Sequence, residues 1–163
     1  MARTSLSIEQ VLELLAAAPE RMAALTAGVE PALLRTPPAP EEWSANDVLA
    51  HLRACADMWG GSIETMLAGE HPTIRAINPR SWIKQTDYRD LEFGPSLEAF
   101  TAQRAELLRR LKAMPPDGWS RSATFTGAGN PVERSVFSQA QRLVVHERPH
   151  LKQIEQIVNA VRR

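Results

Sequence analysis

Residues 142–154 read Arg-Leu-Val-Val-His-Glu-Arg-Pro-His-Leu-Lys-Gln-Ile, and their apolar side chains recur every three or four positions. This spacing predicts a long C-terminal helix that begins between Pro131 and Ser135. Because residues four apart lie on one helix face, two histidines join its apolar stripe and can converge on one ion. The stripe consists of Leu143, His146, His150, Ile154, Ile157 and Val161.

Two earlier helices have clear N-terminal signals. The first is predicted to begin at Ser7, where Gln10 completes a capping box. The second is predicted to begin at Ser44, with Asp47 in the third helical position. Trp43 precedes that cap and is placed to pack onto the first turn. Both segments continue with apolar residues at helical spacing, which predicts helices with one buried face.

A further helix is predicted from Ser96 to about Met114, and the remaining segments are interpreted as connections. Residues 70–94 form a long loop in which Asn78 starts a short helical turn. Thr124–Asn130 is rich in Gly and Thr and is predicted to be another connector. No segment shows the alternation of a β-strand. The sequence therefore predicts an all-α fold, a four-helix bundle with two long connections.

The composition indicates a single domain spanning residues 1–163. The 19 basic and 19 acidic residues balance, which argues against nucleic-acid binding because that requires a basic face. No apolar run approaches the roughly 20 residues that span a bilayer, and the N-terminus lacks a signal-peptide pattern. The single cysteine, Cys55, argues against an internal disulfide framework. We therefore expect a cytoplasmic protein that acts on a small molecule.

His51 supplies a third imidazole from the second predicted helix. Three histidines leave coordination positions open, as is typical of catalytic metal sites. The alternative is that each is an ordinary core histidine satisfied by a carbonyl or a water, since an unpaired buried polar group costs roughly 1–3 kcal/mol. Cys55 lies one turn after His51 and is either a further ligand or, as is commoner, a small buried hydrophobe. His71 precedes Pro72 in a loop and is expected to be exposed.

Two residues between the paired histidines complicate the interpretation. His146-Glu147-x-x-His150 matches the zinc-protease pattern, yet Glu147 is expected to point away from His146 by about 100°. The helix of such a protease normally lies beside a sheet, and the sequence predicts none. Pro149 removes one backbone hydrogen bond and could kink the helix. The sequence leaves open whether His146 and His150 stay aligned.

The arrangement of these residues resembles that of the DinB-like superfamily of metalloenzymes. One matching motif is the helix start Trp43-Ser44 followed by His51-Leu52. The other is His146-Glu147-x-x-His150 followed by Gln153-Ile154. Together with the four long helices, the similarity covers essentially the whole chain.

The resemblance implies a DinB-type bundle whose helices run up-down-down-up. It also implies a divalent metal ion, commonly nickel or zinc, held by three histidines. Matched by position, His51 is the first ligand, and His146 and His150 are the second and third. Some members of the family are transferases or isomerases that use a low-molecular-weight thiol, so the resemblance implies such a thiol as a second cofactor.

We therefore expect a metal-dependent enzyme in which the ion activates a thiol or a water. Group transfer from a low-molecular-weight thiol fits the family better than hydrolysis. The alternative is a non-catalytic bundle that binds a metal or small ligand, or that forms a homodimer. A closed structural site would need a fourth protein ligand, for which Cys55 is the nearest candidate.

Overall fold

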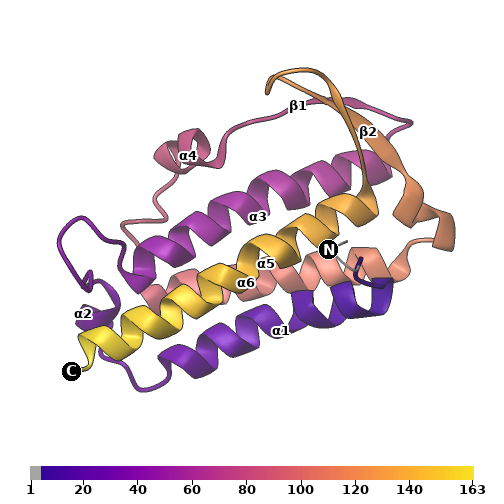
Figure 1. Cartoon of the computed structure of the whole chain (residues 1–163). Coiled ribbons are helices and arrows are strands. Elements are labelled where there is room, and N and C mark those ends of the chain that lie inside the picture. Colours follow the sequence, from indigo (N-terminus) through magenta and orange to yellow (C-terminus); the bar gives the residue numbers. More distant parts are fainter. Residues whose placement is uncertain (1–4) are drawn as a thin grey trace.

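The computed structural model describes residues 5–163 and contains four long helices (Figure 1). They are α1 (Ile8–Thr26), α3 (Ala45–Ala68), α5 (Phe93–Ala113) and α6 (Val136–Val161). The shorter helical elements are α2 (Pro31–Leu34), α4 (Pro79–Trp82), η1 (Ile83–Gln85) and η2 (Pro116–Ser120). The strands are β1 (Thr73–Arg75), β2 (Ser122–Thr126) and β3 (Val132–Ser135). The four long helices predicted from the sequence are confirmed.

The long helices form a bundle in which each packs mainly against two others. α6 contacts α1 and α3, and α5 contacts the same two helices. α1 and α6 run in one direction, whereas α3 and α5 run in the other (Figure 1). Because α3 and α5 are parallel, the chain between them must return along the bundle, and this requires a long connection. The long predicted loop is that return path.

Side-chain hydrogen bonds cap the N-termini of α1, α3 and α6, and the sequence predicted the first two of these caps. Ser7 and Gln10 form a complete capping box at the start of α1. Ser44 and Asp47 form another at α3, where the Ser44 hydroxyl oxygen accepts a hydrogen bond from the Asp47 amide at 3.1 Å. Ser135 caps α6, at the end of the interval predicted for its start. These contacts satisfy amide groups that have no partner within the helix and fix where each helix begins.

The apolar faces of the long helices are buried between them. Their largest fully buried apolar side chains are Phe100, Leu15, Met22, Leu49, Leu52, Ile63, Met66, Leu111, Leu143 and Ile154. Burial of this surface provides the main driving force for folding. Within residues 5–163, no helix has both the length and the apolar character that a membrane span requires.

A buried ion pair ties α5 to α6 inside this core. Arg104 donates hydrogen bonds to both carboxylate oxygens of Glu147, and it also donates to the Leu15 carbonyl at 3.0 Å. The two charged side chains are at most 4% exposed. Glu147 therefore points into the core and away from His146, as predicted.

The prediction that the chain contains no strand is wrong. The three strands form one sheet in the order β1-β2-β3, with β2 parallel to β1 and antiparallel to β3. Residues 124–130, predicted to be a connector, contain the end of β2 and the turn that leads to β3. The strands have three to five residues, so the alternation of buried and exposed positions is too short to detect.

A carboxylate of α3 helps to attach the long segment between α3 and α5 to the bundle. Asp57 of α3 accepts hydrogen bonds from Trp82, Tyr88 and Gln103. The short helical turn predicted at Asn78 is present as α4, and the Asn78 side chain caps it. This attachment holds α4 beside α3, next to the histidine cluster described below.

Candidate metal centre

His51 and His146 meet where α3 packs against α6. His51 lies about two turns after the Ser44 cap of α3, and His146 lies near the middle of α6. Their Nε2 atoms are 3.2 Å apart, and both side chains are partly buried. Packing of the two helices thus brings together two of the residues that the sequence singled out as candidate ligands.

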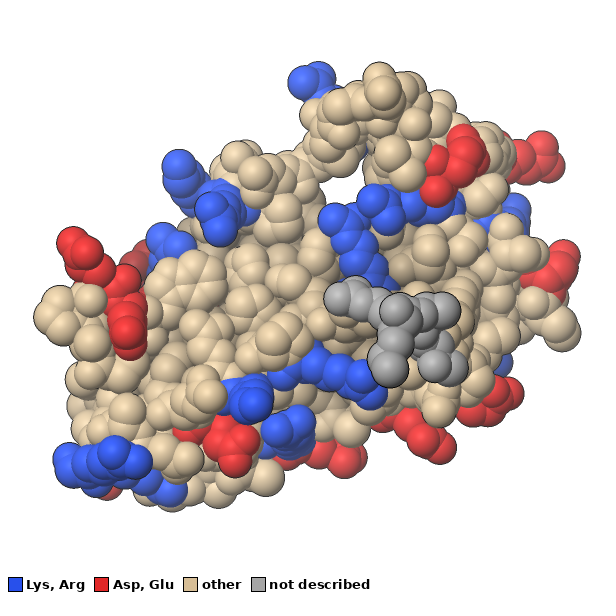
Figure 2. Space-filling model, viewed as in Figure 1, with Lys and Arg blue, Asp and Glu red and all other residues tan. Residues whose placement is uncertain are grey.

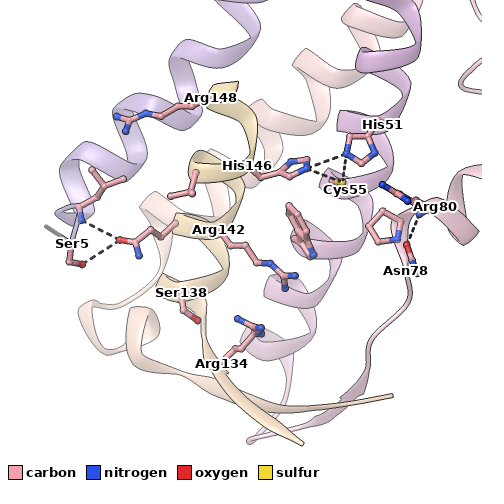
Figure 3. A pocket seen from close by; sticks show the side chains of 15 residues that line it. Ser5, His51, Cys55, Asn78, Arg80, Arg134, Ser138, Arg142, His146 and Arg148 are labelled. Atoms are coloured by element: carbon pink, nitrogen blue, oxygen red, sulfur yellow. Dashed lines mark hydrogen bonds between the residues drawn. The ribbon is translucent and has the colours of Figure 1, made fainter. Parts of the chain in front are cut away.

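Cys55 joins these histidines. Its Sγ lies 3.7 Å from Nε2 of His51 and 3.9 Å from Nε2 of His146. The ligand atoms of the three residues all lie within 4.8 Å of one another (Figure 3). We call this group the donor cluster. Cys55 is buried, as expected for a small hydrophobe, but its sulfur faces the two imidazoles.

His150 lies beside the donor cluster. Its ring centroid is 4.6 Å from that of His146 and 4.9 Å from that of His51. Its Nδ1 lies 2.9 Å from the side-chain oxygen of Gln153. α6 continues without interruption through Pro149, so the proline does not separate the two histidines. The three imidazoles are therefore neighbours, with Cys55 closest to His51 and His146.

The environment keeps two of the imidazoles neutral. Burial, together with His150 and Arg80, lowers the pKa of His51 to about 4. Burial, together with His150 and His51, lowers the pKa of His146 to about 4. Neutral imidazole is the form that binds metal ions. Burial, with Glu147, raises the pKa of the Cys55 thiol to about 12, so this thiol needs a nearby cation to ionise.

Two tryptophans enclose the histidines. The ring of Trp43 lies 5.2 Å from the ring of His51 and stacks at 6.4 Å from that of His150. Trp59 contacts the ring of His146 edge-on, with centroids 4.9 Å apart. These apolar rings restrict the imidazoles and reduce the water around them, which strengthens electrostatic interactions in the site.

A cavity of about 1090 Å³ reaches the donor cluster from the surface. His51, Cys55 and His146 contribute to its wall, together with Trp59 and Asn78. Four arginines line the same cavity, namely Arg80, Arg134, Arg142 and Arg148. Figure 2 shows blue side chains over this face of the molecule, whereas most red side chains lie toward its margins. The cavity is large enough for a small-molecule substrate.

No sequence motif indicated a role for these arginines. Arg142 lies four residues before His146, so the helical spacing that paired the histidines also placed Arg142 on their face. Arg80 and Arg134 come from the long connections, where no periodicity indicated their position. His71, by contrast, is exposed as predicted, and hydrogen bonds with Ser122 and Thr124 hold it at the sheet.

The donor cluster fits a divalent metal ion. Tetrahedral coordination by nitrogen at about 2.1 Å and sulfur at about 2.3 Å separates two nitrogens by roughly 3.4 Å and a nitrogen from the sulfur by roughly 3.6 Å. The corresponding distances here are 3.2, 3.7 and 3.9 Å. A cation placed between the facing Nε2 atoms would also accept both of their lone pairs. Nitrogen and sulfur donors suit zinc and nickel better than magnesium or calcium.

Comparison with known proteins places the chain in a family. The model of the DinB superfamily matches residues 14–154, and the chain therefore belongs to the DinB superfamily. This confirms the resemblance seen in its sequence motifs. No curated protein sequence matches the chain.

A solved structure has the same fold. YfiT from Bacillus subtilis, described as a probable metal-dependent hydrolase with an unusual four-helix bundle topology, superimposes with a TM-score of 0.78. The match covers 96% of this chain and 90% of YfiT, at 18% sequence identity. At this identity the likeness establishes the four-helix bundle fold alone.

Proposed function

We propose that this protein is a metal-dependent enzyme whose divalent ion, nickel or zinc, is held by His51, His146 and His150. The observation that carries the proposal is the 3.2 Å approach of two imidazole nitrogens in the wall of an accessible cavity. The low pKa of both imidazoles and the neighbouring ring of His150 support it. The metal-dependent character attributed to YfiT is consistent with it.

A bound divalent ion supplies positive charge that lowers the pKa of a thiol or water beside it. The protein contributes a cavity that admits a small molecule and aromatic rings that limit water around the histidines. We propose group transfer or isomerisation with a low-molecular-weight thiol, which the family resemblance favours. Hydrolysis is the alternative, and it is the activity attributed to YfiT.

A second candidate function is a non-catalytic metal-binding bundle, and the position of Cys55 favours it. If Cys55 and the three histidines all bind one ion, four protein ligands close the site, as in structural metal centres. If Cys55 does not bind, three histidines leave a position for a substrate. Cys55→Ala distinguishes the two. An open site retains most of its metal affinity in this variant, whereas a closed tetrahedral site loses a ligand and binds far more weakly.

Metal analysis of protein purified without a histidine tag tests the primary proposal. We expect about one nickel or zinc ion per chain. Metal content should fall sharply in each of the variants His51→Ala, His146→Ala and His150→Ala. It should stay unchanged in His71→Ala, because His71 is exposed at the sheet. Equal metal content in the wild type and the three site variants would contradict the proposal. Turnover of a thiol-dependent test reaction that requires the bound ion would then establish catalysis.

A further inference from the structure

Three arginines line the cavity that reaches the donor cluster. Arg142 lies one turn before His146 on α6, and Arg80 extends from α4 toward Cys55 (Figure 3). Arg134 reaches into the same cavity from β3, below Arg142 in Figure 3. We call these three residues the arginine cluster. Three separate parts of the fold thus direct positive charge toward one cavity.

Arg142 is held in position by an aromatic ring. Its guanidinium carbon lies 4.5 Å from the centroid of Trp59, within the range of a cation–π contact. The same tryptophan contacts the ring of His146. Trp59 therefore contacts both Arg142 and His146, and it holds Arg142 close to the donor cluster. Stacking uses the face of the guanidinium group and leaves its N–H groups available at the edge.

The arginine cluster has no counter-charge in the part of the chain that the structure describes. Among residues 5–163, no carboxylate pairs with Arg80, Arg134 or Arg142, and no Asp or Glu lines the cavity. The whole chain has as many acidic as basic residues, so this excess of positive charge is local. Neighbouring like charges repel, and a cavity with low-dielectric walls strengthens their field. An anion that entered would relieve this repulsion.

We propose that the arginine cluster binds the carboxylate or phosphate group of an anionic small-molecule substrate and holds that substrate beside the donor cluster. The inference rests on the proposed metal-dependent function and specifies its substrate class. Guanidinium groups match both anions because their paired N–H groups can donate to two oxygens at once. Since Arg80 and Arg142 line one cavity from different elements, we expect both to contact an anion that binds there.

Binding of simple probes tests this inference. Succinate, inorganic phosphate and uncharged succinamide are titrated by calorimetry into the wild-type protein, both metal-loaded and metal-free. The titrations are repeated with Arg142→Gln, Arg80→Gln and Arg148→Gln. Arg148 is a matched control, because it lies on the same helix and lines the same cavity but points away from the donor cluster (Figure 3). Metal content is measured for each variant.

We expect at least one of the two anions to bind and succinamide not to bind, with affinity decreasing as salt increases. Each loss of a contacting arginine weakens anion binding by about tenfold or more, whereas Arg148→Gln has little effect. The preferred anion, succinate or phosphate, identifies the group that is recognised.

Two outcomes separate this inference from the proposed function. If neither anion binds, or if Arg142→Gln and Arg80→Gln bind as tightly as wild type, the arginine cluster is not an anion site, even where metal content is normal. If the wild type binds no metal but binds an anion through these arginines, the anion site stands and the metal-dependent function fails.

Discussion

Nδ1 of His150 lies 2.9 Å from the side-chain oxygen of Gln153, within the same helix. An amide oxygen only accepts hydrogen bonds, so this contact places the proton of His150 on Nδ1 and leaves a lone pair on Nε2. Partners of this kind orient ligand imidazoles in metal sites. Gln153 thus selects the form of His150 that can bind a metal ion.

The first prediction concerns this contact. Gln153→Ala should weaken metal binding by about 10–100-fold, because His150 loses the partner that fixes its orientation and its proton. Gln153→Glu should retain affinity, since a carboxylate also accepts from Nδ1. Gln156→Ala, an exposed position on the same helix, serves as the control. Competition with a chelator measures the affinities, and equal binding by Gln153→Ala and wild type would show that the contact has no role.

The second prediction concerns pH. In the folded protein the pKa values of His51 and His146 are lowered to about 4, whereas in the unfolded chain they are near 6.5. Between these values the unfolded chain binds more protons, so the free energy of unfolding should fall as the pH is lowered from about 6.5 to about 4. Urea denaturation of metal-free protein at several pH values measures this. The double variant with His51→Gln and His146→Gln should show a weaker dependence of the free energy of unfolding on pH. An unchanged slope in that variant would show that these two histidines do not cause the dependence.

The features that the sequence predicted are those that depend on local spacing. The caps at Ser7 and Ser44 act over three residues, so their motifs identify them without knowledge of the fold. The neighbouring positions of His146 and His150 follow from the helical repeat alone. The approach of His51 required only that its helix pack against the C-terminal one through their apolar faces.

The features that the sequence did not predict depend on contacts between distant segments. β1 pairs with β2 across some fifty residues, from Thr73 to Thr124, and no local pattern specifies this register. Arg80 and Arg134 reach the cavity only because the return path and the sheet fold over the bundle. Cys55 shows that even a residue on a predicted helix face can make contacts that its spacing does not reveal. Its spacing placed it one turn from His51, but only the packed structure shows that its sulfur faces His146 as well.

The third prediction concerns the ion pair in the core. Removing one member of a buried pair leaves the other charge uncompensated, so Glu147→Ala should lower the free energy of unfolding by about 3–5 kcal/mol. Arg104→Met combined with Glu147→Leu replaces the pair with apolar side chains and should recover most of that loss. Chemical denaturation measures both variants. A loss of less than about 1 kcal/mol in Glu147→Ala would mean that water reaches the guanidinium group.

The fourth prediction contrasts the two neighbours at the start of α3. Ser44→Ala should lower the free energy of unfolding by about 0.5–2 kcal/mol, because the cap is lost, and should leave metal affinity nearly unchanged. Trp43→Ala should lower both, since the Trp43 ring contacts His51 and His150 as well as the core. Melting temperature and metal affinity are measured for each. Loss of metal affinity in Ser44→Ala without loss of stability would contradict a purely capping role.

The fifth prediction links the return path to the arginine cluster. Trp82 and Tyr88 of the return path both donate hydrogen bonds to Asp57, so Asp57→Ala leaves both of them without this acceptor and loosens the segment that holds Arg80. Trypsin should then cleave within residues 70–92 faster than in wild type.

Succinate or phosphate should also bind Asp57→Ala more weakly, because Arg80 is no longer held beside the donor cluster. Metal content should stay the same, since Asp57 contacts none of the donor atoms. Asp117→Ala, in the exposed first turn of η2, is the control for loss of an aspartate. If anion affinity in Asp57→Ala equals that of wild type while proteolysis accelerates, Arg80 does not contribute to the anion site, and recognition rests on Arg134 and Arg142.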